Sequence, residues 1–222
     1  MIPEGIKVIS FDLDGTLVDS EFSEWVWSVG IPQLFAEKRG ISFDEAKEIV
    51  EGEYRKVGDG SLQWYDIKYW FNFFHLDGHW KPLLNRFSHK IKTYPEVSKV
   101  LQDLSRNYRL IIISNAAREF IDIEVEVSAL RRYFSRIFSA TSDFGQIKKT
   151  AEFYGRICQL LGISFQEILH VGDHWEFDYL VPKGRGIKAL HIDRSWSRSG
   201  DDVIRNLEEV GQRLGLRTEV EG

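Results

Sequence analysis

The segment Phe11–Leu17 reads Phe-Asp-Leu-Asp-Gly-Thr-Leu and follows an apolar run at residues 6–11. Side chains alternate between two faces of an extended strand, so Asp12 and Asp14 are expected to point the same way. Gly15 then lets the backbone turn at the end of the strand. Two carboxylates this close repel each other strongly unless a cation or a shared proton lies between them. The segment therefore predicts a Mg²⁺ site or a carboxylate nucleophile at a strand end.

Apolar runs typical of buried parallel strands recur along the chain, and segments with helical spacing separate them. The expected strands are Ile6–Phe11, Arg109–Ser114, Arg136–Ala140, Ile168–Val171 and Ile187–Ile192. The expected helices are Glu96–Ser105, Phe120–Leu130, Lys149–Leu161 and Asp201–Leu214. This alternation predicts an α/β fold with a doubly wound parallel sheet. Such sheets bind ligands at the carboxyl ends of their strands.

Residues 18–92 interrupt the alternation, because they contain no convincing strand. Helical segments are expected instead at Glu21–Arg39, Phe43–Lys56, Leu62–Leu76 and Lys81–Lys90. The pattern predicts a helical insertion at 18–92 between two parts of one domain, 1–17 and 93–222. Half of the aromatic residues of the chain lie in this insertion, and they include Trp25, Trp27, Trp64, Tyr65, Trp70, Phe71, Phe73, Phe74 and Trp80. We expect most of them to form the insertion's own core, with a ring- or sugar-binding role as the alternative.

Composition narrows the class of protein further. The net charge of −5 gives no reason to expect nucleic acid or an anionic membrane as a partner. Cys158 is the single cysteine, so a disulfide framework and a cysteine-based zinc site are excluded. The N-terminus shows no secretory leader pattern, and no apolar run approaches the ~20 residues that span a bilayer. A cytoplasmic protein is expected, with polar, frayed residues at Thr218–Gly222.

Four groups of polar residues follow or lie near predicted strand ends, where the fold would bring them together. Aspartates supply hard oxygen ligands that suit Mg²⁺, and a hydroxyl or amide suits phosphate oxygens. A lysine would neutralise the substrate and keep a nucleophilic carboxylate ionised. The four groups are Asp12 with Asp14, Ser114 with Asn115, Lys148 with Lys149, and Gly172-Asp173 with Asp178.

In this order, the four groups resemble the motifs of the haloacid dehalogenase (HAD) superfamily of phosphohydrolases. The resemblance covers nearly the whole chain and implies a Rossmann-like catalytic core with a C1-type helical cap at residues 18–92. Counting back from Leu161-Gly162 by the family's spacing selects Lys148 as the motif lysine. The chain departs from the family there, because Lys149 stands where proline is usual. Lys149 is therefore the alternative.

The resemblance also implies roles for the residues around the first and fourth motifs. Asp12 would attack phosphorus and form an aspartyl-phosphate, and Asp14 would act as general acid and base. Mg²⁺ would be held by Asp12, the backbone carbonyl of Asp14, and Asp173. Asp178 would support the metal through water or by orienting its neighbours.

The phosphate group would be bound by the second and third motifs and by the backbone after the first strand. The residues expected to bind it are Leu13, Ser114, Asn115 and Lys148. Of the two histidines beside the fourth motif, His170 is expected in the core, and His174 is a candidate for the cleft. Neither is expected to bind the metal.

The predicted function is a Mg²⁺-dependent phosphatase acting on a small phosphorylated metabolite such as phosphoglycolate, a sugar phosphate or a nucleoside monophosphate. Asp14 favours phosphoryl transfer, because HAD members that cleave carbon–halogen bonds generally lack this second aspartate. A phosphomutase of the same superfamily is the alternative enzyme, and a non-catalytic phosphometabolite-binding protein is the alternative from another class. A monomer or a homodimer is expected.

Overall fold

Six parallel strands form the centre of the molecule in the order β3-β2-β1-β4-β5-β6. The computed structural model describes residues 5–215, so the predicted frayed end at Thr218–Gly222 lies outside the described residues. In register, Phe11 at the end of β1 pairs with Ile112 and Val171 on its two neighbours. The strands are β1 Val8–Phe11, β2 Arg109–Ser114, β3 Phe134–Ser139, β4 Ile168–Gly172, β5 Lys188–Ile192 and β6 Val203–Ile204. The predicted doubly wound parallel sheet is thus confirmed.

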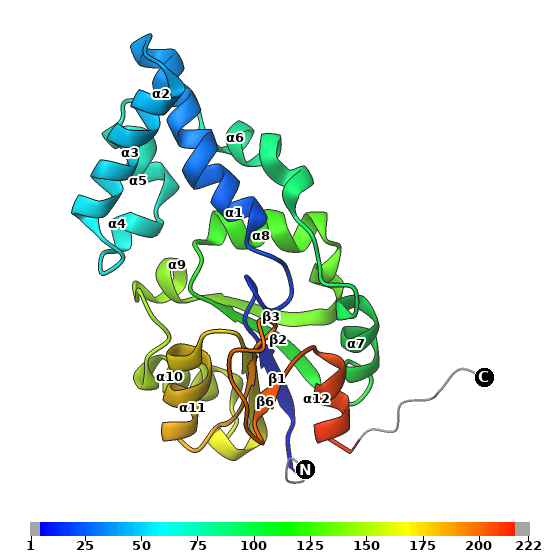
Figure 1. Cartoon of the computed structure of the whole chain (residues 1–222). Helices are drawn as coiled ribbons and strands as arrows, with labels where there is room; N and C mark the ends of the chain where they lie inside the picture. The colour runs from blue at the N-terminus through cyan, green and yellow to red at the C-terminus, as the bar shows by residue number, and fades with distance from the viewer. Residues whose placement is uncertain (1–4, 216–222) are drawn as a thin grey trace.

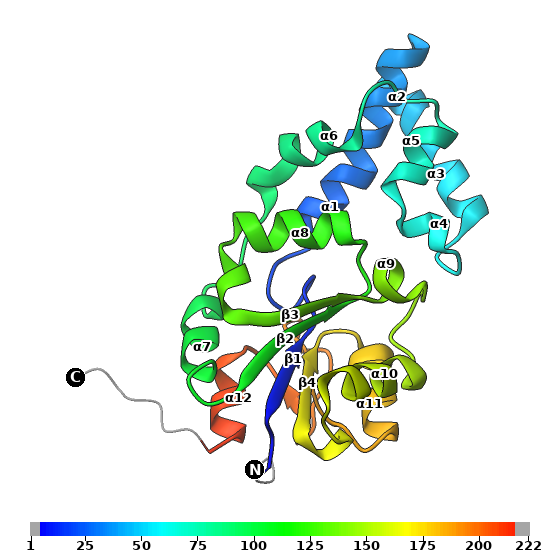
Figure 2. The same ribbon diagram turned by 180° about the vertical axis from the view of Figure 1, so that it is seen from behind.

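Helices cover both faces of this sheet, as Figures 1 and 2 show from opposite sides. Alternate strand residues enter two apolar cores: Ile112 lies in one, and its neighbours Ile111 and Ile113 lie in the other. The first core includes α7 (Val97–Leu104), α8 (Arg118–Val127) and α12 (Glu208–Arg213). The second includes α10 (Ala151–Leu161), with α11 (Val181–Gly184) packed beside it. Each fully buried aliphatic side chain contributes about 1.5–3 kcal/mol to the folded state.

Short elements complete the core of the fold. The 3-10 turns η3 (Leu130–Tyr133) and η4 (Phe165–Glu167) precede β3 and β4, and α9 (Ala140–Phe144) follows β3. A π-helical turn, η5 (Trp175–Leu180), follows β4 and passes directly into α11. Pro182 stands in the first turn of α11. The change from π- to α-helix thus falls one residue before this proline.

The prediction of a single helix over Asp201–Leu214 is wrong. Val203 and Ile204 form the edge strand β6, which pairs with His191 and Ile192 of β5. Both side chains are buried, and β-branched residues suit a pleated strand better than a helix. Pairing with the sheet outweighs the helical spacing here, so helix forms only at α12.

Residues 21–90, which lie between β1 and α7, fold into helices that stand above one end of the sheet (Figure 1). The helix predicted at Leu62–Leu76 is interrupted at Asp66, whose backbone is extended and whose carboxylate accepts a hydrogen bond from the Lys68 N–H. The side chain thus caps the second part. The elements are α1 Glu21–Trp25, the π-helical η1 Val26–Gly30, α2 Ile31–Arg39, α3 Phe43–Val57, α4 Leu62–Tyr65, α5 Ile67–Phe73, α6 Trp80–Phe87 and the 3-10 turn η2 Ser88–Lys90.

An aromatic core holds these helices together. Trp70 is fully buried, and its ring stacks on Phe74 at a centroid distance of 5.5 Å. Phe71 and Phe74 are also buried, which confirms the expected core role for these aromatic residues. The same core includes Phe120 of α8. The inserted helices therefore pack on the sheet-covering helix α8 as well as on one another.

The chain enters and leaves the inserted helices at adjacent points. Val18 and Thr93 form an antiparallel bridge, and the Asp19 N–H donates to the Lys92 carbonyl at 3.0 Å. This pairing supports the proposed division of the chain into a core at 1–17 and 93–222 and a cap at 18–92. We use the name cap for residues 18–92 below.

Candidate active site

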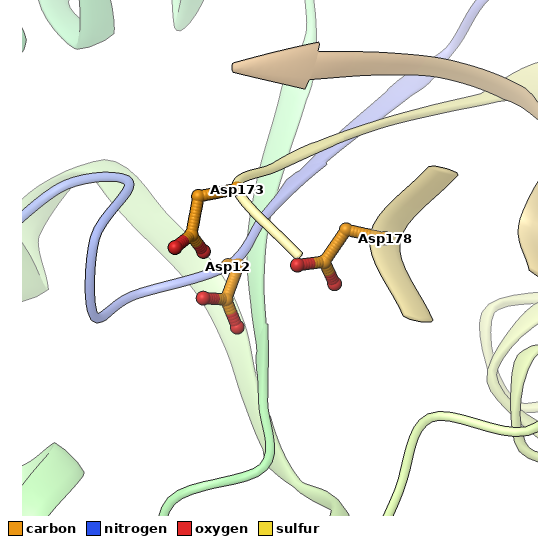
Figure 3. Close-up of side chains that lie close together, drawn as sticks. All are labelled: Asp12, Asp173 and Asp178. Carbon is orange, nitrogen blue, oxygen red and sulfur yellow. The ribbon is translucent and has the colours of Figure 1, made fainter. Parts of the chain in front are cut away.

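Three aspartates meet at the carboxyl ends of the two central strands. Asp12 directly follows β1, Asp173 follows β4, and Asp178 comes from the turn η5 (Figure 3). Carboxylate oxygens from the three lie within 4.8 Å of one another. The Asp12 N–H donates to the Val171 carbonyl at 2.9 Å, which extends the sheet pairing by one residue and fixes the position of Asp12.

Two glycines leave the space that these carboxylates occupy. A Cβ atom at Gly172 would overlap the carboxyl group of Asp178, and one at Gly15 would overlap that of Asp173. Gly15 also has a φ of +74°, a conformation that residues with a side chain rarely adopt. Only glycine at these two positions permits the three-carboxylate arrangement without displacement of backbone or side chains.

The structure places Lys149, and not Lys148, among the aspartates. The Lys149 ammonium group contacts Asp12, lies 2.5 Å from Asp178 Oδ1, and donates to the Ile113 carbonyl at 3.2 Å. Its side chain is only 1% exposed. The ammonium group of Lys148 instead lies over the Phe177 ring, 5.1 Å from its centroid. The choice of Lys148 as the site lysine is therefore corrected to Lys149.

The start of helix α10 places both lysines in the loop that precedes it. Helix α10 begins at Ala151, because the Thr150 hydroxyl caps it by accepting a hydrogen bond from the Phe153 N–H. Both lysines therefore precede the helix, in non-helical chain where neighbouring side chains point in different directions. Only Lys149 is directed into the protein. The helix expected to begin at Lys149 thus begins two residues later.

Burial and charge act against each other in this cluster. Burial raises the pKa of Asp12, and the charges of Asp178 and Asp173 raise it further. Lys149 lowers the pKa of Asp12 but only in part, so this pKa lies well above its usual value. Burial would lower the pKa of Lys149, but Asp12 and Asp178 outweigh that effect and hold it above its usual value. One ammonium group thus faces three carboxylates, and the excess negative charge favours binding of a cation.

His170 contacts the Asp178 carboxylate and fixes its orientation. Both side chains are fully buried, and the histidine Nε2 lies 3.0 Å from Asp178 Oδ1. Burial lowers the pKa of His170, which makes the ring neutral. Nε2–H then donates to Asp178, while Nδ1 lies 2.8 Å from the Ser10 hydroxyl. The expected position of His170 in the core is confirmed. His170 also contacts a residue of the site, Asp178.

The fourth-motif turn is closed by hydrogen bonds to Asp178 and His174. The backbone N–H of His174 donates to Asp178 Oδ2 at 3.0 Å, and its Nδ1 accepts from the Phe177 N–H at 3.2 Å. The histidine ring stacks on that of Phe177 and lines the cavity described below. The candidate position of His174 in the cleft is confirmed.

Glu124 of α8 is a residue of the site that the sequence analysis missed. Its side chain is fully buried beside the carboxyl group of Asp14. Burial, together with the Asp14 charge, raises the pKa of Glu124 well above its usual value. Burial likewise raises the pKa of Asp14 to about 6. The sequence did contain a signal, because Glu124 lies on the buried stripe of α8 with Phe120, Ile121 and Val125.

The second-motif residues lie at the end of β2. Ser114 is 2% exposed, and its hydroxyl accepts a hydrogen bond from the Ala116 N–H at 3.0 Å. The Asn115 side-chain oxygen is buried without a hydrogen-bond partner among the described residues. Both residues line the cavity, whereas the Leu13 side chain is buried in the core. A contribution of Leu13 to phosphate binding would therefore come from its backbone N–H.

A cavity of about 370 Å³ connects this cluster with the cap. Its core end is charged, and its cap end is mostly aromatic. It is lined by Asp12, Asp14, Ser23, Trp27, Tyr54, Trp64, Tyr65, Ser114, Asn115, Ala116, Ala117, Phe120, Lys149, Asp173, His174 and Asp178. Some cap aromatics therefore face the cavity, in contrast to the buried rings of the cap core.

The donor set of the cluster fits a hard divalent cation. All three clustered side chains offer carboxylate oxygens, and they lie close enough for one ion to bind two of them at once. Burial and the neighbouring Asp178 raise the pKa of Asp173 to about 6, a sign that its charge is not fully balanced. Asp178 already accepts hydrogen bonds from Lys149, His170 and His174. Asp12 and Asp173 are therefore better placed than Asp178 to bind an ion directly.

The sequence profile of the haloacid dehalogenase-like hydrolases matches residues 6–183, which include all four motifs and the cap. The chain belongs to this family. A HAD phosphatase of Thermococcus onnurineus has a similar structure, with a TM-score of 0.81 and 29% identity over 96% of this chain and all of that chain. The magnesium-bound HAD hydrolase YfnB of Bacillus subtilis shares the fold, with a TM-score of 0.65 and 16% identity over 96% of this chain and all of that chain. The GMP/IMP nucleotidase YrfG of Escherichia coli is 22% identical over 77% of this chain and 75% of that protein.

Membership in the HAD-like hydrolases confirms the resemblance, the fold class and the prediction of an enzyme. No helix within residues 5–215 of this HAD protein is long and apolar enough to cross a membrane. The cytoplasmic location and the choice between monomer and homodimer stay predictions.

Proposed function

We propose that this HAD protein is a Mg²⁺-dependent phosphatase that hydrolyses a small phosphorylated metabolite through an aspartyl-phosphate. The observation that carries the proposal is the cluster of Asp12, Asp173 and Lys149 at the base of a cavity whose other end is uncharged. Such a cavity accepts an anionic group at one end and a leaving group at the other. The HAD phosphatase of T. onnurineus and the nucleotidase YrfG support phosphate-ester chemistry.

In this proposal Asp12 is the nucleophile. Lys149 holds it in place and favours its ionised form, since the ammonium group contacts the carboxylate directly. Asp12 and Asp173, with the backbone carbonyl of Asp14, would hold Mg²⁺. The ion supplies charge neutralisation of the phosphate oxygens. Asp178 positions Lys149 and the backbone of the turn after Asp173.

Asp14 is the proposed general acid and base. Its pKa of about 6 lies near neutral pH, where a group can both release and regain a proton. It would protonate the leaving oxygen when the ester bond breaks, and then accept a proton from the attacking water. The Ser114 hydroxyl and the Asn115 amide would donate hydrogen bonds to phosphate oxygens, together with the backbone N–H of Leu13.

Phosphate release from a panel of phosphate monoesters, with and without Mg²⁺, tests the proposal. We expect release that requires Mg²⁺ and falls by at least about 10⁴-fold in Asp12→Asn, because the nucleophile is lost. Asp77→Asn in the cap is the matched control, since Asp77 is exposed and pairs only with Lys38 in the described chain. No release from any ester, or full activity of Asp12→Asn, would contradict the proposal.

A further inference from the structure

The two ends of the cavity differ in chemistry. The charged side chains that line it, among the described residues, all belong to the core. The cap contributes Ser23 and four aromatic residues, and the core helix α8 contributes Phe120. We call these five aromatic residues the aromatic wall: Trp27, Tyr54, Trp64, Tyr65 and Phe120. A substrate that fills the cavity thus meets charge at one end and aromatic rings at the other.

The rings of the aromatic wall are held in fixed orientations. Trp27 stacks on Phe120 with a centroid distance of 5.2 Å and an interplanar angle of 20°. Tyr54 packs edge-on against Trp27 at 6.1 Å and against Trp64 at 6.0 Å. The Tyr54 hydroxyl donates to the Trp27 carbonyl at 3.4 Å, which links helix α3 to η1. The wall is therefore a prepared surface, and little side-chain entropy is lost when a ligand packs on it.

This surface discriminates between classes of leaving group. A carboxylate or second phosphate would be desolvated beside the wall without a cation from the cap to compensate it. A bare sugar would leave most of its hydroxyls without partners, because the wall offers few polar atoms and the Tyr54 and Tyr65 hydroxyls already donate to backbone carbonyls. A neutral planar ring, in contrast, stacks on aromatic side chains, and the free-energy cost of removing it from water is small.

We propose that the aromatic wall selects phosphate monoesters whose leaving group carries a neutral planar ring, and that nucleoside monophosphates are the substrate class. This inference rests on the proposed phosphatase function and specifies its substrate. The cavity volume of about 370 Å³ lies in the range of small-ligand sites, roughly 300–1,000 Å³. The phosphate would lie at Asp12 and Lys149, and the base would stack on the wall.

A pair of substrates that differ only in the base provides the test. Adenosine monophosphate and ribose 5-phosphate carry the same phosphorylated sugar, and only the first carries a ring for stacking. We expect kcat/KM to be higher for the nucleotide by roughly five- to 150-fold, the gain from stacking one base. Phosphoglycolate should be a poorer substrate than the nucleotide. Equal values for the nucleotide and the sugar phosphate would overturn the inference and leave the phosphatase proposal intact.

Variants of the wall separate stacking from general damage to the fold. Trp27→Leu should lower kcat/KM for the nucleotide about tenfold or more, mainly through KM, and change that for ribose 5-phosphate less than threefold. Trp27→Phe keeps a ring and should retain most of the preference. Phe73→Leu is the matched control, because Phe73 is a cap aromatic that is 41% exposed and does not line the cavity. An equal loss for both substrates in Trp27→Leu would contradict the inference.

A binding measurement separates failure of this inference from failure of the proposed function. In Asp12→Asn, which should bind ester without turnover, calorimetry compares adenosine monophosphate with ribose 5-phosphate. Tighter binding of the nucleotide supports the inference even if no ester, including p-nitrophenyl phosphate, is hydrolysed by the unaltered protein. Equal affinity, or no binding of the nucleotide, would overturn it.

Discussion

Lys149 donates a hydrogen bond to Asp12 although the two residues lie 137 positions apart in the chain. The contact joins the loop before α10 to the end of the central strand β1. Because Lys149 also pairs with Asp178, a single buried ammonium group connects three separate segments of the core. The arrangement of the site therefore depends on this side chain more than on any other cation within residues 5–215.

The two adjacent lysines should respond differently to substitution. Lys149→Met leaves Asp12 and Asp178 buried without their counter-charge, so we expect a loss of about 3–5 kcal/mol in unfolding free energy. Activity should fall by at least about 10²-fold. Lys148→Met is the matched control and should retain activity within about threefold. Phosphate-release assays and urea unfolding check both, and a greater loss in Lys148→Met would restore Lys148 as the site lysine.

Mg²⁺ should stabilise the protein as well as support activity. Binding to Asp12 and Asp173 offsets the repulsion among the carboxylates, so the ion should bind the folded state more tightly than the unfolded chain. At 100 times its Kd it would add about 2.7 kcal/mol, a rise of roughly 5–10 °C in Tm. Calorimetric melting with Mg²⁺ and with a chelator measures the rise, which should be lost in Asp173→Asn. An equal rise in that variant would place the ion elsewhere.

Glu124 should make stability fall as pH rises. Its pKa is raised in the folded protein, so the unfolded chain releases this proton first, near pH 4.5. Above that pH the folded state therefore loses stability until the raised pKa is passed. Glu124→Gln stays neutral, so it should melt at a higher temperature than the unaltered protein at pH 8 and at a similar temperature at pH 4. Glu126→Gln, on the exposed side of α8, should change neither value.

Gly172 should not tolerate a side chain. The Cβ of Gly172→Ala would overlap the Asp178 carboxyl group, so we expect a loss of about 1–3 kcal/mol in stability and a larger loss of activity as Asp178 moves. Gly211→Ala provides the control, because a Cβ atom there meets nothing within 4 Å in helix α12. That change should be neutral or stabilising by up to about 1 kcal/mol. Urea unfolding and phosphate-release assays of both variants would show whether the close approach of Gly172 to the Asp178 carboxyl group matters.

Much of the fold could be predicted from the sequence because its strands are short, apolar and followed by polar residues. The run Arg109–Ser114 is buried almost throughout, and its spacing alone predicts a central parallel strand. The edge strand Val203–Ile204 could not be found in this way. Two residues carry too little periodicity, and only pairing with β5 makes them a strand.

The sequence by itself determined that Asp12, Asp14 and Asp173 lie at or just after strand ends, because strand ends and tight turns are local features. Tertiary structure alone decided that Lys149 enters the site, that Glu124 lies beside Asp14, and that Trp27 faces the cavity while Trp70 fills the cap core. These choices depend on where a helix begins and which neighbour covers each face. The helix start follows from the local cap at Thr150, whereas the neighbour that covers each face is decided only when distant parts of the chain pack together.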